Sequence, residues 1–192
     1  MEKPQKSLFA LRPISSEDKG RLLCWRNLEK NRVVMYNSHL ISEEEHNEWF
    51  RHQITSKQNT NLIFSYTGDP IGTLQLQNHN TEHGTADWAF NFGDIPLGTP
   101  RGIGRIMEFF ALEFFFERKN IRKLSCQVLS NNPTVMALHE KFGFEKEGVL
   151  KKHIKREDAY LDVHLFALFE TDWPRIRDFW KPQIFEAIES AN

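Results

Sequence analysis

The sequence predicts an α/β fold, with helices packed around a mixed, mostly antiparallel sheet. Strand-like runs and helical segments alternate along the 192 residues in the order strand, two helices, three strands, helix, strand, helix, strand. No long linker, repeat or low-complexity stretch separates them. We therefore expect one continuous domain over residues 8–170, with residues 171–192 as a helical tail that packs on it.

Capping residues mark the helices expected in the first half. Asp18 lies in the first turn of a helix that should reach Asn27. Ser42 and Glu45 form the capping-box pattern at the start of another helix. The strands of this half are expected at residues 8–12, 62–66, 71–76 and 86–92.

The second half contains the most apolar helix. Residues 103–117 are apolar around most of a helical circumference, which predicts burial. Asn132 and Pro133 fit the cap and first position of a helix that ends near Phe142. Strands are expected at residues 123–128 and 160–169, followed by a helix at 173–188 that packs Ile176, Phe179 and Trp180 on the domain.

Composition excludes several classes of function. A formal net charge of −1 and a mixed charge pattern give no sign of a nucleic-acid-binding surface. The two cysteines form neither a disulfide framework nor a metal motif, so we expect two buried, reduced thiols and no metal. No stretch reads as a signal peptide or membrane span, which predicts a cytoplasmic protein without membrane contact.

A glycine-rich segment at residues 97–105 follows a strand and opens a helix. Uncovered backbone amides at a helix N-terminus attract phosphate, and Arg101 and Arg105 add positive charge. The segment is neither the G-x-G-x-x-G dinucleotide fingerprint nor a P-loop. On its own it fits an ordinary glycine-rich turn equally well.

A second motif, downstream of the glycine-rich segment, makes a specific family resemblance visible. R-G-x-G at residues 101–104 is followed by N-x-x-x-x-A-L-x-E-K-x-G-F at residues 132–144. Together they resemble the Gcn5-related N-acetyltransferase (GNAT) superfamily, and the resemblance covers residues 8–170. It implies a sheet with one splayed strand, helices on both faces, and acetyl-coenzyme A as the cosubstrate.

The resemblance also implies where the cosubstrate binds. Its pantetheine would pair with the splayed strand and its pyrophosphate with the glycine-rich loop. The expected residues are Phe90, Asn91, Phe92, Thr99, Arg101, Gly102, Ile103, Gly104, Arg105 and Asn132. The family often has Gln or Arg where Thr99 stands, which removes a long polar side chain but leaves the backbone amides.

The N-terminal half suggests the acceptor. It concentrates cationic and aromatic side chains, which suit a nucleotide because rings stack on a base and Arg binds phosphate. The arrangement resembles the acetyltransferases of pseudaminic-acid biosynthesis, which acetylate the 4-amino group of a UDP-linked amino-deoxy sugar. That resemblance implies a substrate site of Arg26, Met35, Tyr36, His46, Trp49 and Gln127.

Other interpretations stay open. Each of these residues taken singly also fits a core or ordinary surface position. Ribosomal-protein and polyamine acetyltransferases share the second half, although a polyamine site should be rich in acidic residues. A non-catalytic module that binds acetyl-coenzyme A or a nucleotide is a third alternative, and a homodimer is a further expectation.

Two residues are candidates for proton transfer. His139 stands where many GNAT relatives have the tyrosine that protonates the leaving thiolate, and a histidine can do the same near neutral pH. The alternative is that His139 only packs or hydrogen-bonds. Asp87, on the splayed strand, could accept the amine proton, or it could be a solvated carboxylate.

Overall fold

A seven-stranded sheet forms the centre of the computed structural model, which describes residues 3–56, 59–157 and 159–186. The strand order is β1-β2-β3-β4-β5-β7-β6, and only the β4–β5 pair is parallel. The strands are β1 (Phe9–Pro13), β2 (Thr60–Tyr66), β3 (Asp69–Asn80), β4 (Thr85–Phe92), β5 (Lys123–Leu129), β6 (Glu145–Lys155) and β7 (Tyr160–Phe169). The predicted mixed, mostly antiparallel sheet is confirmed.

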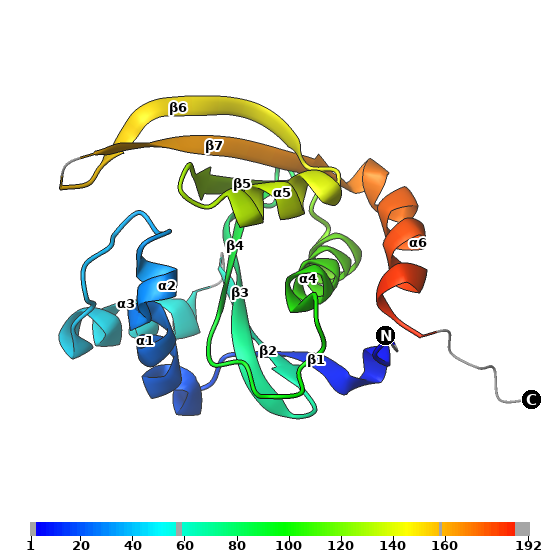
Figure 1. Cartoon of the computed structure of the whole chain (residues 1–192), viewed down its shortest axis with the longest axis horizontal. Coiled ribbons are helices and arrows are strands. Elements are labelled where there is room, and N and C mark those ends of the chain that lie inside the picture. The colour runs from blue at the N-terminus through cyan, green and yellow to red at the C-terminus, as the bar shows by residue number, and fades with distance from the viewer. Residues whose placement is uncertain (1–2, 57–58, 158, 187–192) are drawn as a thin grey trace, which may run out of the picture.

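Helices cover both faces of the sheet (Figure 1). They are α1 (Lys19–Asn27), α2 (Glu29–Arg32), α3 (Glu43–Thr55), α4 (Ile103–Lys119), α5 (Pro133–Lys141) and α6 (Trp173–Ile184). In Figure 1, α1, α2 and α3 lie on one side of β3 and β4, and α4 lies on the other side with α6 beyond it. The short helix α2 was not predicted, since four residues are too few to show a helical period.

The predicted capping residues begin their helices as expected. The Ser42 hydroxyl accepts a hydrogen bond from the Glu45 amide at 3.2 Å, and the Asn132 side chain accepts one from the Val135 amide at 3.4 Å. Both bonds satisfy amides that have no acceptor inside their helix. The expected burial of α4 is also confirmed, because Phe109, Leu112 and Phe115 are fully buried in the core.

The sheet opens where β4 and β5 separate. These strands pair only at Thr85, Ala86 and Asp87 of β4, although both continue for several more residues. Beyond Asp87, β4 keeps its ladder with β3, but no strand of the described chain pairs with its other edge. The divergence of the two strands is visible in Figure 1 and confirms the predicted splayed strand.

Strand β6 was missed by the sequence prediction. It is the edge strand of the sheet, and almost all its residues are exposed or half-buried. An edge strand in solvent needs no alternation of apolar and polar residues, and Lys and Glu are typical there. Its pairing with β7 is also interrupted by two register shifts.

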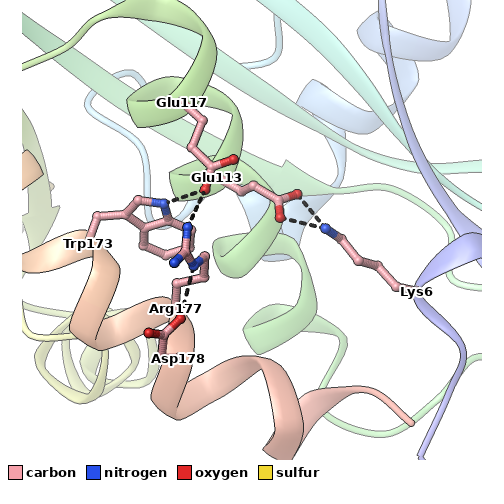
Figure 2. Close-up of polar contacts among 6 residues, drawn as sticks. All are labelled: Lys6, Glu113, Glu117, Trp173, Arg177 and Asp178. Carbon is pink, nitrogen blue, oxygen red and sulfur yellow. Dashed lines mark hydrogen bonds and ion pairs between the residues drawn. The ribbon is translucent and has the colours of Figure 1, made fainter. Parts of the chain in front are cut away.

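Helix α6 packs against α4 and the end of α5. The rings of Trp180 and Phe142 stack with centroids 4.8 Å apart. The Trp173 indole donates a hydrogen bond to Glu117 on α4 at 2.9 Å, and Arg177 also contacts Glu117 (Figure 2). Ile176 and Trp180 are buried as expected, but Phe179 is 59% exposed, so its predicted packing is wrong. The last residues of the expected helix, from 187 on, lie outside the described residues.

Candidate active site

A cavity of about 420 Å³ lies between the N-terminal helices and the splayed strands. A volume in this range is typical of small-molecule sites. All six residues predicted to bind the acceptor line it: Arg26, Met35, Tyr36, His46, Trp49 and Gln127. Of the other predicted site residues, Phe90, Asn91, Asn132 and His139 line it too. The fold thus gathers side chains from both halves of the chain around one space.

Close packing joins the helices to the end of β4. A side chain at Gly93 would place its Cβ 1.9 Å from an atom of the Trp25 ring, so only glycine lets the indole lie there. The Asn31 side-chain amide donates hydrogen bonds to the carbonyls of Trp25 and Phe92, at 2.7 and 2.9 Å. These contacts fix one wall of the cavity relative to the sheet.

The loop after α2 is held from the opposite wall. The Tyr36 hydroxyl donates to the Gln127 side chain on β5. The Asn131 side-chain amide donates to the Val33 carbonyl at 2.8 Å, and Arg156 donates to the Tyr36 carbonyl at 3.2 Å. Residues about a hundred positions apart therefore close this part of the cavity.

Arg26 brings a partly desolvated charge to the cavity. Its Nη2 donates to the Asn37 carbonyl at 2.6 Å, while its buried Nη1 has no hydrogen-bond partner among the described residues. Burial lowers the pKa of the guanidinium, although Glu45 acts to raise it. An unsatisfied buried donor is costly, so this atom is suited to meet an acceptor on a ligand.

His46 is held in place by the contacts of its ring. Its Nε2 lies 2.8 Å from the Lys19 carbonyl, and its ring stacks on Trp49 with centroids 5.3 Å apart. Burial lowers the pKa of His46, so the imidazole is neutral at neutral pH. The pair therefore presents a rigid aromatic surface.

His139 is buried and paired with Glu108, a residue that the sequence interpretation missed. The Nδ1 of His139 lies 2.8 Å from Oε1 of Glu108 on α4, and both side chains are almost entirely buried. Burial acts to lower the pKa of His139, but Glu108 and the neighbouring Cys126 outweigh it and raise the pKa to about 10. The imidazole therefore carries a proton at neutral pH.

Asp87, the candidate acceptor for the amine proton, lies apart from the other candidate site residues. It is half-buried, accepts a hydrogen bond from the Asn78 side chain at 2.9 Å, and does not line the cavity. The physical reason is that Asp87 belongs to the part of β4 still paired with β5, before the strands separate. Phe92 also does not line the cavity, although it ends the splayed strand.

The glycine-rich loop forms a separate part of the site. Gly102 caps the N-terminus of α4 with a φ of 80°, and no residue from Thr99 to Arg105 lines the cavity. The Thr99 amide donates to the Pro96 carbonyl at 3.2 Å, so it is not free as expected. The Arg105 amide donates to the Gly102 carbonyl at 2.9 Å, but the Ile103 and Gly104 amides have no backbone acceptor among the described residues, and Arg101 and Arg105 are exposed beside them. Charge and free donors at a helix start suit a phosphate group.

Several cavity residues escaped the sequence interpretation. They are chiefly Glu45, Thr73 and Gln75 on the wall, with Glu108 behind it. The one available signal for Glu108 was a carboxylate within a mostly apolar helical run, a signal that Glu113 shares. Cys126 is buried as expected, whereas Cys24 is exposed, so the prediction of two buried thiols is half wrong.

Comparison with known families decides the classification. A family model described as an acetyltransferase (GNAT) domain matches residues 11–165. The chain belongs to this family. The splayed strand and the α4 loop are where the resemblance in the sequence placed them.

Individual relatives are more distant. An uncharacterised prophage-derived N-acetyltransferase, YokL of Bacillus subtilis, is 29% identical over 122 residues, which cover 63% of this chain and 67% of that protein. The spermidine N(1)-acetyltransferase of Vibrio cholerae is 25% identical over 163 residues, covering 81% of this chain and 91% of that one. The structure of the Vibrio cholerae spermidine N-acetyltransferase with CoA and spermine matches with a TM-score of 0.79 at 21% identity, covering 88% and 99% of the two chains.

The GNAT protein is therefore an acetyl-coenzyme A-dependent N-acetyltransferase. The expected resemblance to pseudaminic-acid enzymes is not supported by these comparisons, since the Vibrio cholerae relative is named for spermidine. No described helix is long and apolar enough to span a membrane. Within the described ranges, no three His, Cys, Asp or Glu side chains are grouped to hold a metal ion.

The residues present fit acetyl-coenzyme A. The unpaired edge of β4 offers backbone groups to an extended amide chain, and the α4 N-terminus offers amides and arginines to phosphates. Two cavity residues of β4 also have buried polar atoms without a partner in the described part of the chain, Trp88 Nε1 and Asn91 Oδ1. When bound, acetyl-coenzyme A supplies the acetyl group as a reactive thioester.

Proposed function

We propose that this GNAT enzyme acetylates the amino group of a nucleotide-linked sugar, the 4-amino group of a UDP-linked amino-deoxy sugar. The observation that carries the proposal is the buried Nη1 of Arg26, which has no partner within residues 3–56, 59–157 and 159–186 and lies in the wall of an aromatic cavity. A phosphate oxygen would satisfy this donor with a charge-assisted hydrogen bond. The flat surface of His46 and Trp49 is suited to a base or sugar ring.

The charge of the cavity supports an acceptor that is not strongly cationic. Glu45 is the only acidic residue among the described residues that line it, and Arg26 opposes it with a positive charge. A polyamine carries several ammonium groups, and like charges repel within a partly desolvated site. An anionic nucleotide diphosphate that bears one amine has the complementary distribution.

His139 is proposed as the group that protonates the leaving thiolate. It lines the cavity with Asn132, which stands at the start of the same helix. An amine on a sugar is less basic than a lysine side chain, so a larger share of it is neutral near pH 7. The proposal therefore needs no strong base, and Asp87 has no part in it.

A polyamine is the second candidate acceptor. The similarity to the Vibrio cholerae spermidine N(1)-acetyltransferase over most of both chains favours it. Glu45 could hold one ammonium group of such a substrate. The two candidates differ in the sign of the acceptor's charge, so one assay separates them.

The test is thiol release from acetyl-coenzyme A with a panel of acceptors. The panel contains UDP-linked 4-amino sugars, the same sugars without the nucleotide, spermidine, spermine and a ribosomal-protein N-terminal peptide. The proposal expects turnover with the UDP-linked sugars, and competitive inhibition by UDP alone. Turnover of spermidine or the peptide without turnover of any UDP-amino sugar would overturn it.

A further inference from the structure

Glu108 is a fully buried carboxylate next to the candidate proton donor. We propose that Glu108 is a positioning residue for acetyl transfer, holding the His139 ring by Nδ1 so that its Nε2–H is kept for the leaving thiolate. The inference rests on the proposed role of His139. It goes further by assigning a function to a residue of α4 outside the cavity wall.

The geometry supports a fixed ring. Oε1 of Glu108 lies 2.8 Å from Nδ1 of His139, and the two residues lie on different helices, α4 and α5. Aromatic rings pack around the imidazole, with the Trp88 centroid at 5.4 Å and the Phe144 centroid at 5.0 Å. The ring is confined, and its contact with Glu108 requires a proton on Nδ1 when the carboxylate is ionised.

The surroundings of His139 contain few other titratable groups. Glu108 faces it from α4, and Cys126 on β5 also acts to raise its pKa, through its charge and a side-chain hydrogen bond. The neighbours from β4, β7 and the residue before β6 are aromatic: Trp88, Phe90, Phe166 and Phe144. Glu108 is therefore the main source of negative charge that keeps this buried imidazole protonated.

The proton balance of the reaction gives Glu108 its role. The neutral amine attacks the thioester carbonyl, a C–N bond forms, the C–S bond breaks, and the thiolate leaves with the electron pair. His139 Nε2–H gives its proton to that sulfur, and the proton from the acetylated nitrogen is released to solvent. The contact between Glu108 and Nδ1 holds the ring in place throughout, so that Nε2 can take up a proton again and the imidazole returns to its starting state.

The experiment compares Glu108→Gln with the unmodified enzyme. Glutamine keeps the shape and can still accept the hydrogen bond from Nδ1–H, but it lacks the charge. Loss of an opposite charge should move the high-pH limb of the kcat profile down by about 1–3 pH units. Glu108→Ala, which removes the hydrogen bond as well, should lower kcat further at every pH.

A second measurement does not depend on the acceptor. Long-range ¹H–¹⁵N NMR follows the titration of His139, whose signal is identified by its absence in His139→Gln. In Glu108→Gln this titration should shift downward by about 1–3 pH units as well. Glu113→Gln is the matched control, since Glu113 is also on α4 but pairs with Lys6 away from the cavity (Figure 2).

The outcomes separate the two hypotheses. If His139→Gln keeps near-normal kcat with chemistry rate-limiting, the proposed role of His139 fails and the inference fails with it. If His139→Gln lowers kcat but Glu108→Gln leaves both the pH limb and the NMR titration unchanged, only the role of Glu108 is overturned. A lower melting temperature in Glu108→Gln with an unmoved pH limb would likewise reduce Glu108 to a packing residue.

Discussion

Arg26 illustrates how a single side chain limits the choice of acceptor. Its charge alone would not mark it, since exposed arginines are common on protein surfaces. What distinguishes it, among the residues that the structure describes, is a buried Nη1 without a partner, on a cavity wall with one acidic residue. A bound ligand with an anionic oxygen would accept the hydrogen bond that this atom can donate.

We expect Arg26→Ala to weaken acceptor binding. Loss of a charge-assisted hydrogen bond should cost roughly 1.5–3 kcal/mol, mostly as a higher KM with little change in kcat. Calorimetric titration with UDP measures the same loss without catalysis. Arg51→Ala, an exposed arginine on α3, is the control and should leave the UDP affinity unchanged. Equal UDP affinity in both variants and the unmodified enzyme would contradict the proposed phosphate contact.

Asp18 is a second residue with a measurable consequence, here for stability. Its carboxylate is fully buried and accepts hydrogen bonds from Arg12 at 2.6 and 2.7 Å and from the Ser15 amide at 2.9 Å. Chiefly through the bond from Arg12, the pKa of Asp18 is lowered from 3.8 to about 2. The folded state therefore favours the ionised form more than the unfolded state does.

The contribution of Asp18 to the free energy of unfolding depends on pH. A lowered folded-state pKa gives stability that is present above about pH 4 and is lost as the pH falls toward 2. The contribution is roughly 2 kcal/mol. Asp18→Asn should lower the free energy of unfolding in urea at pH 7, and the difference from the unmodified protein should shrink toward pH 2. Asp69→Asn, at an exposed position, should show no such convergence.

At the start of α4, two glycines differ in whether a substitution would disturb the fold as well as cosubstrate binding. Gly102 has a φ of 80°, and an added Cβ would lie 2.8 Å from the Arg105 guanidinium, so any substitution there strains the free protein. Gly104 has ordinary helical geometry, and its Cβ would meet only Leu138 at 3.5 Å, a normal contact. Gly104 is therefore the better position at which to test phosphate approach.

We expect Gly104→Val to raise the Kd for coenzyme A by about tenfold or more while the chain stays folded. The branched side chain would cover the amides that a phosphate must approach closely. Gly20→Val is the matched control, since Gly20 lies in α1 and an added Cβ there meets nothing within 4 Å. Unchanged coenzyme A affinity in Gly104→Val, measured by calorimetry, would show that the phosphates bind elsewhere.

At the scale of the whole molecule, α6 and the N-terminal segment are both tied to α4. Trp173 and Arg177 contact Glu117, and Lys6 pairs with Glu113 one turn earlier on the same helix (Figure 2). Trp180 adds the stacked contact with Phe142. Because α4 carries Glu108 and begins at the glycine-rich loop, α6 supports the helix on which the candidate site depends.

Two neighbouring residues of α6 test this support. Trp180 is 8% exposed and Phe179 is 59% exposed. Trp180→Ala should lower the free energy of unfolding by about 3–5 kcal/mol, whereas Phe179→Ala should change it by about 0.5 kcal/mol or less. Equal losses, measured by urea denaturation, would mean that α6 does not pack on the domain through this face.

The expected homodimer stays a prediction that analytical ultracentrifugation can test.

The amino-acid sequence by itself was enough for features that depend on nearby residues. The caps at Ser42 and Asn132, the apolar helix α4 and the glycine-rich loop each follow from a contiguous run of residues. Capping bonds and helical periodicity act over three or four positions, so they can be read without a fold. The two motifs then sufficed for the family and its splayed strand.

Tertiary structure decided which side chains share an environment. Glu108 meets His139 across 31 positions, and Tyr36 meets Gln127 across 91. It also left Asp87 outside the cavity and placed β6 at an edge where no sequence pattern is required. Burial and hydrogen-bond partners depend on residues that packing brings from elsewhere in the chain. The raised pKa of His139 and the missing partner of Arg26 Nη1, among the described residues, could therefore be found only in the folded molecule.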